Sequence, residues 1–131
     1  MLKTITVGTE PRGCALTPSG TFLVVANHTS GTVSIINTTT YAIQTVTTGG
    51  NPNAVAITDR GHGNDSIETV FVTDFFAHLI SGGPGEGFDT GKQGIVWAFL
   101  FSNPSKITAI PLSPIKNVGF TADSDRLLSA D

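Results

Sequence analysis

A repeat spaced by 41 residues is the feature of this sequence that most constrains its fold. Four residues of a turn-and-strand pattern, Gly8, Pro11, Ala15 and Thr17, recur 41 positions later as Gly49, Pro52, Ala56 and Thr58. A fixed period of roughly 20–50 residues is typical of repeat architectures, in which each unit buries its apolar surface against its neighbours. We therefore expect an array of similar units.

Each unit contains four short β-branched or apolar runs, separated by Gly, Pro, Asn and Ser turns that predict strands between them. In the first unit the expected strands are 13–17, 22–26, 32–36 and 42–47. In the second unit they are 54–58, 68–73, 95–101 and 107–110, with a long insertion at 75–94. No segment shows the apolar period of a helix.

A lone strand at 4–7 is expected before the first unit, and two more strands are expected within 117–131. When the strands of a unit are called a, b, c and d, the order along the chain is d-abcd-abcd-ab. The 131 residues then form one domain of units 1–7 (partial), 8–49, 50–112 and 113–131 (partial). The run 22–26 is almost continuously apolar, which is typical of a strand covered on both faces.

Composition excludes several classes of function. Charged residues make up 13% of the chain and the formal net charge is −3, which gives no electrostatic reason to bind nucleic acid. No apolar stretch approaches the ~18 residues needed to span a bilayer, so we expect no membrane insertion. Uncharged polar composition of this kind is common in exported proteins. We expect an extracytoplasmic location, periplasmic or secreted, with no export signal in this chain.

Cysteine and histidine usage gives no sign of a metal or a cofactor. Cys14 is the only cysteine, so an intrachain disulfide and a Cys-x-x-Cys site are both excluded. Because it lies in the apolar run 14–16, we expect it to be a small buried residue. The three histidines are far apart and lack metal-ligand spacing. The Gly-rich run at 82–87 lacks the Lys-Ser or Lys-Thr of a phosphate-binding loop.

The motifs of the first unit resemble the YVTN-type β-propeller repeat. They are Val-Gly-x-x-Pro before strand a, Thr-Pro-Ser-Gly after it, Leu-Val-Val-Ala-Asn in strand b and Ser-Gly-Thr-Val-Ser-Ile-Ile-Asn in strand c. The resemblance implies an all-β propeller segment of four-stranded antiparallel blades, part of a larger ring of seven or eight blades. It weakens after residue 75, where only the order of strands supports it.

The expected strand order also predicts partners. Both ends of the chain fall inside a blade, which leaves strand edges and apolar residues such as Ile5, Val7, Leu127 and Leu128 uncovered. We expect the remaining blades of the same propeller, or other copies of the chain, to cover them. The chain expressed alone is then not expected to be a stable monomer.

The resemblance also implies where a ligand would bind. In such propellers the d–a and b–c loops open on one face, which would bring the insertion 75–94 together with the turn at 49–53. Polar residues of these two segments are the candidates for ligand binding: Asn51, Asp74, His78, Asp89 and Lys92. Of these, His78, Asp74 and Asp89 could serve in acid–base or polar roles, and Lys92 could contact an anion.

Three residues recur at one position of the repeat, the end of strand b. They are Asn27, Asp74 and Asp131. We interpret them as structural turn caps rather than as a ring of ligand-binding groups, because Asn and Asp side chains commonly bond nearby backbone at turns. Trp97 alternates with Ile95 and Phe99 and is expected in the core between blades.

Regular repeats without a catalytic constellation favour a binding or scaffold module. No Ser lies in a Gly-x-Ser-x-Gly frame, and no Cys–His pair is apparent. The alternative is a fragment of an exported propeller enzyme, either lactonase-like or of the quinoprotein and amine-dehydrogenase kind. Neither reading requires a cofactor held by this chain's own motifs.

Overall fold

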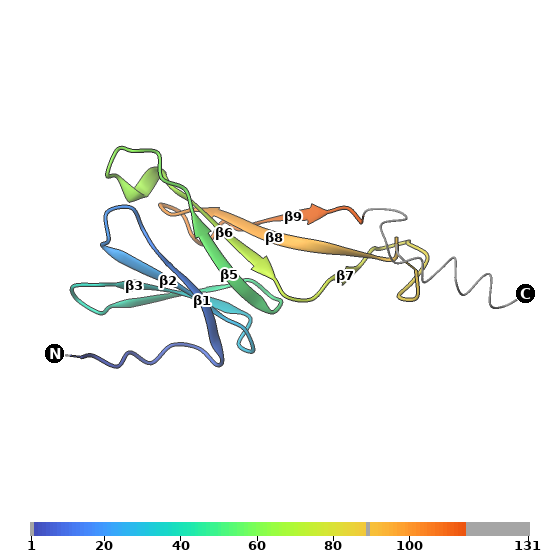
Figure 1. Cartoon of the computed structure of the whole chain (residues 1–131), viewed down its shortest axis with the longest axis horizontal. Coiled ribbons are helices and arrows are strands. Elements are labelled where there is room, and N and C mark those ends of the chain that lie inside the picture. Colours follow the sequence, from blue (N-terminus) through green and yellow to red (C-terminus); the bar gives the residue numbers. More distant parts are fainter. Residues whose placement is uncertain (1, 89, 115–131) are drawn as a thin grey trace, which may run out of the picture.

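A computed structural model describes residues 2–88 and 90–114 of the chain, and it is an all-β structure of two antiparallel sheets (Figure 1). The described part contains almost no helix, as the sequence predicted. The two strands expected within 117–131 lie outside the described residues, and so do Asp89 and Asp131.

The first sheet is a four-stranded meander in which each strand pairs with the next one along the chain. Its strands are β1 (Pro11–Leu16), β2 (Phe22–Asn27), β3 (Thr32–Asn37) and β4 (Ile43–Thr47). All four strands expected in the first unit are confirmed, with small shifts at their ends. The tight turns Pro18-Ser19-Gly20 and Ser30-Gly31 place a glycine at positive φ, which a residue without Cβ adopts at little cost.

The second sheet repeats this order and adds a branch. Its strands are β5 (Pro52–Ile57), β6 (Thr69–Asp74), β8 (Lys92–Leu100) and β9 (Thr108–Leu112), preceded at β6 by the short 3₁₀ turn η1 (Asp65–Ile67). Within the insertion, β7 (His78–Leu79) pairs with the start of β8. That pairing extends β8 to Lys92, three residues before the start predicted from the sequence.

The lone strand expected at 4–7 is wrong. These residues run along the first sheet without joining it, and they belong to no strand. Their β-branched sequence favours an extended backbone, but a strand also needs a neighbour with which to exchange hydrogen bonds. The described residues provide no such neighbour.

The core lies between the two sheets, which face each other with β1 and β5 side by side. The first sheet contributes mainly valine, alanine and isoleucine from β2 and β3, and the second contributes Val70, Val72, Trp97 and Phe99. Trp97 is 5% exposed, so its expected place in a core between neighbouring sheets is confirmed. Gly13 allows the close approach, because a Cβ there would lie 2.4 Å from the Asn53 carbonyl oxygen.

Each sheet turns its other face away from this core. On the first sheet that outer face carries Cys14, which is exposed, so its expected burial is wrong. The reason is strand alternation: Ala15 pairs with the core residue Val24, and Cys14 therefore points the other way. On the second sheet, exposed Leu100, Ile110 and Leu112 lie on the outer face. In the described part, no helix is long and apolar enough to cross a membrane.

Candidate functional site

The loops at one end of the two sheets bring together most of the candidate residues. We call this region the loop end and define it as residues 8–12, 27–31, 49–53 and 74–79. In the first sheet the His28 amide donates to the Glu10 carbonyl at 2.9 Å. In the second, the Phe75 amide donates to the Asn51 carbonyl at the same distance. The repeat has therefore built the same backbone turn twice at this end.

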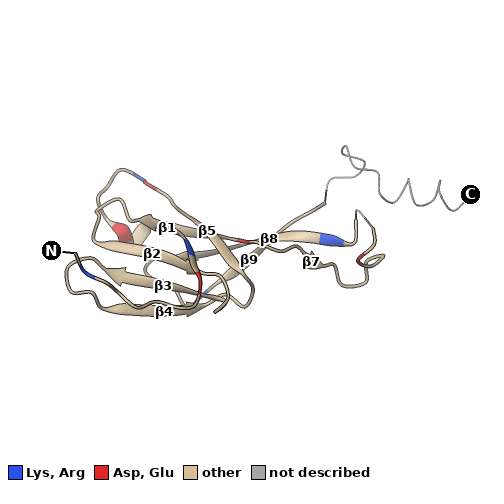
Figure 2. Ribbon diagram, turned by 60° about the horizontal axis from the view of Figure 1, so that its bottom comes forward, with Lys and Arg blue, Asp and Glu red and all other residues tan. Residues whose placement is uncertain are grey.

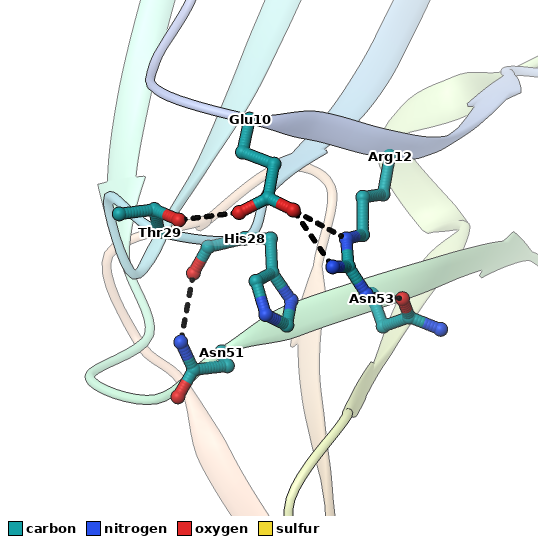
Figure 3. Close-up of polar contacts among 6 residues, drawn as sticks. All are labelled: Glu10, Arg12, His28, Thr29, Asn51 and Asn53. Atoms are coloured by element: carbon teal, nitrogen blue, oxygen red, sulfur yellow. Dashed lines mark hydrogen bonds and ion pairs between the residues drawn. The ribbon is translucent and has the colours of Figure 1, made fainter.

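A polar network occupies the first turn. The Glu10 carboxylate accepts hydrogen bonds from Arg12 Nη2 at 2.7 Å and Arg12 Nε at 3.2 Å, and from the Thr29 hydroxyl (Figure 3). The Thr29 hydrogen bond, followed by those of Arg12, lowers the pKa of Glu10 below its ordinary value. Glu10 holds this position with a φ of 56°, a conformation uncommon for residues with a side chain. The network therefore fixes an ionised carboxylate beside a guanidinium.

Two hydrogen bonds carry the network across to the second sheet. Arg12 Nη1 donates to Asn53 Oδ1 at 3.4 Å, and Asn51 Nδ2 donates to the His28 carbonyl at 3.2 Å. Figure 3 shows the His28 ring lying between these two contacts. The loop end is thus a continuous surface made by both sheets.

Aromatic rings border this network where the insertion begins. The Arg12 guanidinium lies 5.0 Å from the centre of the Phe75 ring, and Phe75 meets His28 edge-on at 5.4 Å. Phe76 packs edge-on against Phe75 at 4.8 Å. Both phenylalanines stay more than half exposed, at 53% and 55%. Exposed aromatic side chains that are held in place by such contacts are characteristic of binding surfaces.

Asp74 and His78 form a second, more buried arrangement at the loop end. The Asp74 side chain is 1% exposed. Its Oδ1 accepts a hydrogen bond from the backbone N–H of Asn51 at 2.9 Å, and its Oδ2 contacts His78 Nε2. The His78 ring remains 40% exposed and lies edge-on to Trp97. The carboxylate therefore orients an imidazole that still reaches solvent.

The remaining candidates are placed differently. Lys92 lies at the start of β8, where its ammonium group forms an ion pair with Glu86 of the insertion. The hydrogen bond from Lys92 lowers the pKa of Glu86. The structure therefore brings Asn51, Asp74 and His78 together and pairs Lys92 with Glu86 instead. Whether any of these residues binds a ligand stays a prediction.

The two described members of the recurring b-strand position use their side chains in different ways. Asn27 is fully buried, and its Nδ2 donates to the hydroxyls of Thr32 at 3.1 Å and Ser34 at 2.9 Å. Its Oδ1 has no hydrogen-bond partner among the described residues. Asp74 instead accepts from the backbone of the preceding turn. The third member, Asp131, lies outside the described residues.

Sequence reasoning did not single out Glu10, Arg12 or Asn53, and it considered His28, which is 6% exposed, only as one of three histidines without metal-ligand spacing. The repeat itself carried the missing signal. Counting 41 residues forward places Glu10 at the position of Asn51 and Arg12 at that of Asn53. A candidate in the second unit should therefore have directed attention to its counterpart in the first.

The chemistry available at the loop end is that of hydrogen bonding, the Glu10–Arg12 ion pair, the contact between the Asp74 carboxylate and the His78 imidazole, and aromatic contact. Across residues 2–88 and 90–114, no three His, Cys, Asp or Glu side chains are grouped to hold a metal ion. Comparison with family models, curated proteins and solved structures finds no match for the chain.

Proposed function

We propose that the chain is a segment of a β-propeller and acts as a binding or scaffold module through its loop end. The propeller reading is supported by the agreement between the two sheets. In both, the strand after the loop-end turn begins at a proline paired with the recurring residue, Pro11 with Asn27 and Pro52 with Asp74. In both, the register shifts directly afterwards. Two sheets that repeat even an irregularity and pack face to face are what consecutive blades require.

One observation carries the binding function: the Glu10–Arg12–Asn53 network continues across both sheets and meets the exposed Phe75–Phe76 pair. A surface with fixed polar groups beside fixed aromatic rings loses little conformational entropy when a partner binds. Arginine and aromatic residues also contribute more than most residues to protein interfaces. A protein or peptide partner fits this surface better than a small molecule does, because the polar and aromatic groups of the loop end lie side by side on an exposed surface.

The test is a selection of a random peptide library on the full chain. Selected peptides should bind the combined variant Phe75→Ala/Phe76→Ala, and the variant Arg12→Ala, about tenfold more weakly than the unchanged chain. Ile110→Ala is the matched control, because Ile110 is an exposed apolar residue on the outer face of the second sheet. Binding to that variant should not change.

Two outcomes contradict the proposal. One is a selection that enriches no peptide. The other is a set of peptides that bind the loop-end variants as well as they bind the unchanged chain. Turnover of a lactone or an amine by the purified chain would also replace the binding function with an enzymatic one.

A fragment of an exported propeller enzyme is the second candidate, and the Asp74–His78 contact is the observation that favours it. A buried carboxylate that orients a solvent-accessible imidazole is half of a general acid–base arrangement. In this reading His78 moves the proton and Asp74 positions it. If the full-length protein turns over lactone or amine substrates, His78→Ala should abolish that turnover. Unchanged turnover in the variant would exclude His78 as the acid–base group.

A further inference from the structure

Residues 4–7 resemble strand β4 in sequence, but no described strand lies beside them as β3 lies beside β4. Counting 41 residues forward, Thr4, Ile5 and Thr6 fall on Thr45, Val46 and Thr47 of β4. In β4 these residues pair antiparallel with β3, as Ser34 with Thr45, Val33 with Val46 and Thr32 with Thr47. No described strand pairs with residues 4–7. Their backbone N–H and C=O groups are therefore available for a ladder.

The segment is held in place at both ends. At one end the Lys3 ammonium group lies 5.3 Å from the centre of the Tyr41 ring. At the other, Gly8 packs so closely over Asn27 that an added Cβ would lie 2.7 Å from it, and the Thr9 amide donates to the Ser30 hydroxyl at 2.6 Å. Figure 1 shows the segment running along the first sheet, outside it. Part of the entropy cost of ordering a strand is thus already met.

A hollow of about 480 Å³ separates this segment from the outer face of the first sheet. Its volume lies within the range of roughly 300–1,000 Å³ found for ligand sites. Hydroxyl groups dominate the lining, with a few aliphatic contacts: Thr6, Val7, Ser30, Thr32, Ser34, Ile43 and Thr45. No lining residue is charged, and Figure 2 shows β3 and β4 without acidic or basic residues. The hollow therefore suits an uncharged occupant that forms hydrogen bonds.

A buried amide lies behind the wall of the hollow. Asn27 donates through Nδ2 to Thr32 and Ser34, which both line the hollow, while its Oδ1 has no partner among the described residues. A buried polar atom without a partner is destabilising. The Asn27 amide nonetheless holds the hydroxyls of Thr32 and Ser34 in place at the wall of the hollow.

We propose that residues 4–7 and this hollow form the seat for an extended, uncharged peptide strand from a protein other than this chain. The incoming strand adds antiparallel beside residues 4–7, as β3 lies beside β4. Its preferred sequence alternates β-branched and small polar residues, as β3 does in Thr-Val-Ser-Ile-Ile-Asn. This seat lies on the outer face of the first sheet and shares only Gly8 and Ser30 with the loop end, so the variants of Arg12, Phe75 and Phe76 do not test it.

A neutral sugar is the competing occupant, because hydroxyl groups also bind sugars. The backbone of residues 4–7 decides between the two. A sugar leaves most of these amides unpaired, whereas a peptide strand pairs them in a ladder. The hollow's lining also contains no aromatic ring on which a sugar could stack.

The test uses the full ¹⁵N-labelled chain, titrated with a synthetic peptide of the sequence of residues 31–38, Gly-Thr-Val-Ser-Ile-Ile-Asn-Thr. The amide signals of residues 4–7 should shift, and these amides should become protected from hydrogen exchange. A control peptide with proline in place of the serine cannot extend the ladder at that position, and it should not protect them.

A substitution in the chain provides the matched test. Ile5→Pro should weaken binding of the peptide about tenfold, because it removes a ladder donor from the seat. Ile5→Val keeps that donor and a β-branched side chain, so its binding should equal that of the unchanged chain. Residues 4–7 belong to no strand, so the amide signals of β3 should report an intact fold in both variants.

Three results would overturn the proposal. The first is an absence of protection at residues 4–7 with the peptide present. The second is a response to maltose at Thr32 and Thr45 without protection of residues 4–7, which would identify a sugar site. The third is protection that rises with protein concentration in the chain alone, because the occupant would then be a second copy.

Discussion

The two sheets reach the same backbone turn at the loop end with different side chains. In the second sheet a buried carboxylate, Asp74, accepts from the Asn51 backbone and holds His78. In the first sheet Asn27 occupies that position, and its Oδ1 has no partner within the described part of the chain. The charged groups Glu10 and Arg12 lie on the surface instead. The repeat thus fixes the backbone, while the residues at equivalent positions decide whether charge is buried or displayed.

The largest expected effect comes from breaking the core on which both turns rest. Trp97→Ala should lower the free energy of unfolding by roughly 3–5 kcal/mol, because a large buried ring is lost from between the sheets. Leu100→Ala, at an exposed position of the same strand, should cost less than about 1 kcal/mol. Urea denaturation followed by circular dichroism measures both, and equal losses would mean that Trp97 does not join the sheets.

A direct comparison of the two turns should give the next largest effect. Asp74→Ala removes the acceptor of the Asn51 amide and the partner of His78, which we expect to cost about 2 kcal/mol of stability. Asn27→Ala should lower the free energy of unfolding by about 1 kcal/mol or less. The substitution removes two hydrogen bonds, but it also removes a buried oxygen that has no partner among the described residues. A larger loss for Asn27 than for Asp74, again in urea, would reverse our view of the two turns.

The opposite end of the sheets should show a pH dependence. There Asp65 accepts from the Ser19 amide at 3.2 Å and from the Ser19 hydroxyl at 2.5 Å. Burial raises the pKa of Asp65, but the hydrogen bonds from Ser19 and Thr17 outweigh it, so the pKa falls below the ordinary value of 3.8. Because the pKa of Asp65 is lower in the folded chain, the ionised carboxylate stabilises the fold at pH values above 3.8. This stabilisation is lost as the pH falls through the folded pKa.

The check on this prediction is thermal unfolding between pH 7 and pH 2, with Asp65→Asn as the comparison. The unchanged chain should lose more stability on acidification than the variant, since the variant has no carboxylate to protonate at this position. Two curves with the same slope below pH 4 would show that the contact between Ser19 and Asp65 does not join the sheets through its charge.

The strands were predictable from the sequence because their information is local. Gly, Pro and Asn mark the turns and β-branched runs mark the strands, and the repeat supplies a second copy of every signal. The strand at 4–7 shows where local information ends: its residues favour extension, but the sequence does not say whether a neighbour is present. The prediction that Cys14 is buried is wrong for a related reason, because an apolar run does not reveal which face of an edge strand is covered.

The candidate site was predictable in part. The position at the end of strand b pointed to Asp74, and the insertion pointed to His78, and the structure places the two in contact. The network of Glu10 and Arg12 depends on a bond to Asn53 in the other sheet, and the pairing of Lys92 with Glu86 depends on how the insertion folds. Contacts of this kind follow from tertiary packing, which residue types alone do not determine.

Two repeats of the same sheet pack face to face on one core, and the single tryptophan tests this packing most directly. In a nuclear Overhauser spectrum of the full chain, the Trp97 indole protons should show cross-peaks to methyl groups of first-sheet core residues such as Ala26 and Val33. Cross-peaks confined to residues 52–112, or an indole freely quenched by iodide, would contradict it.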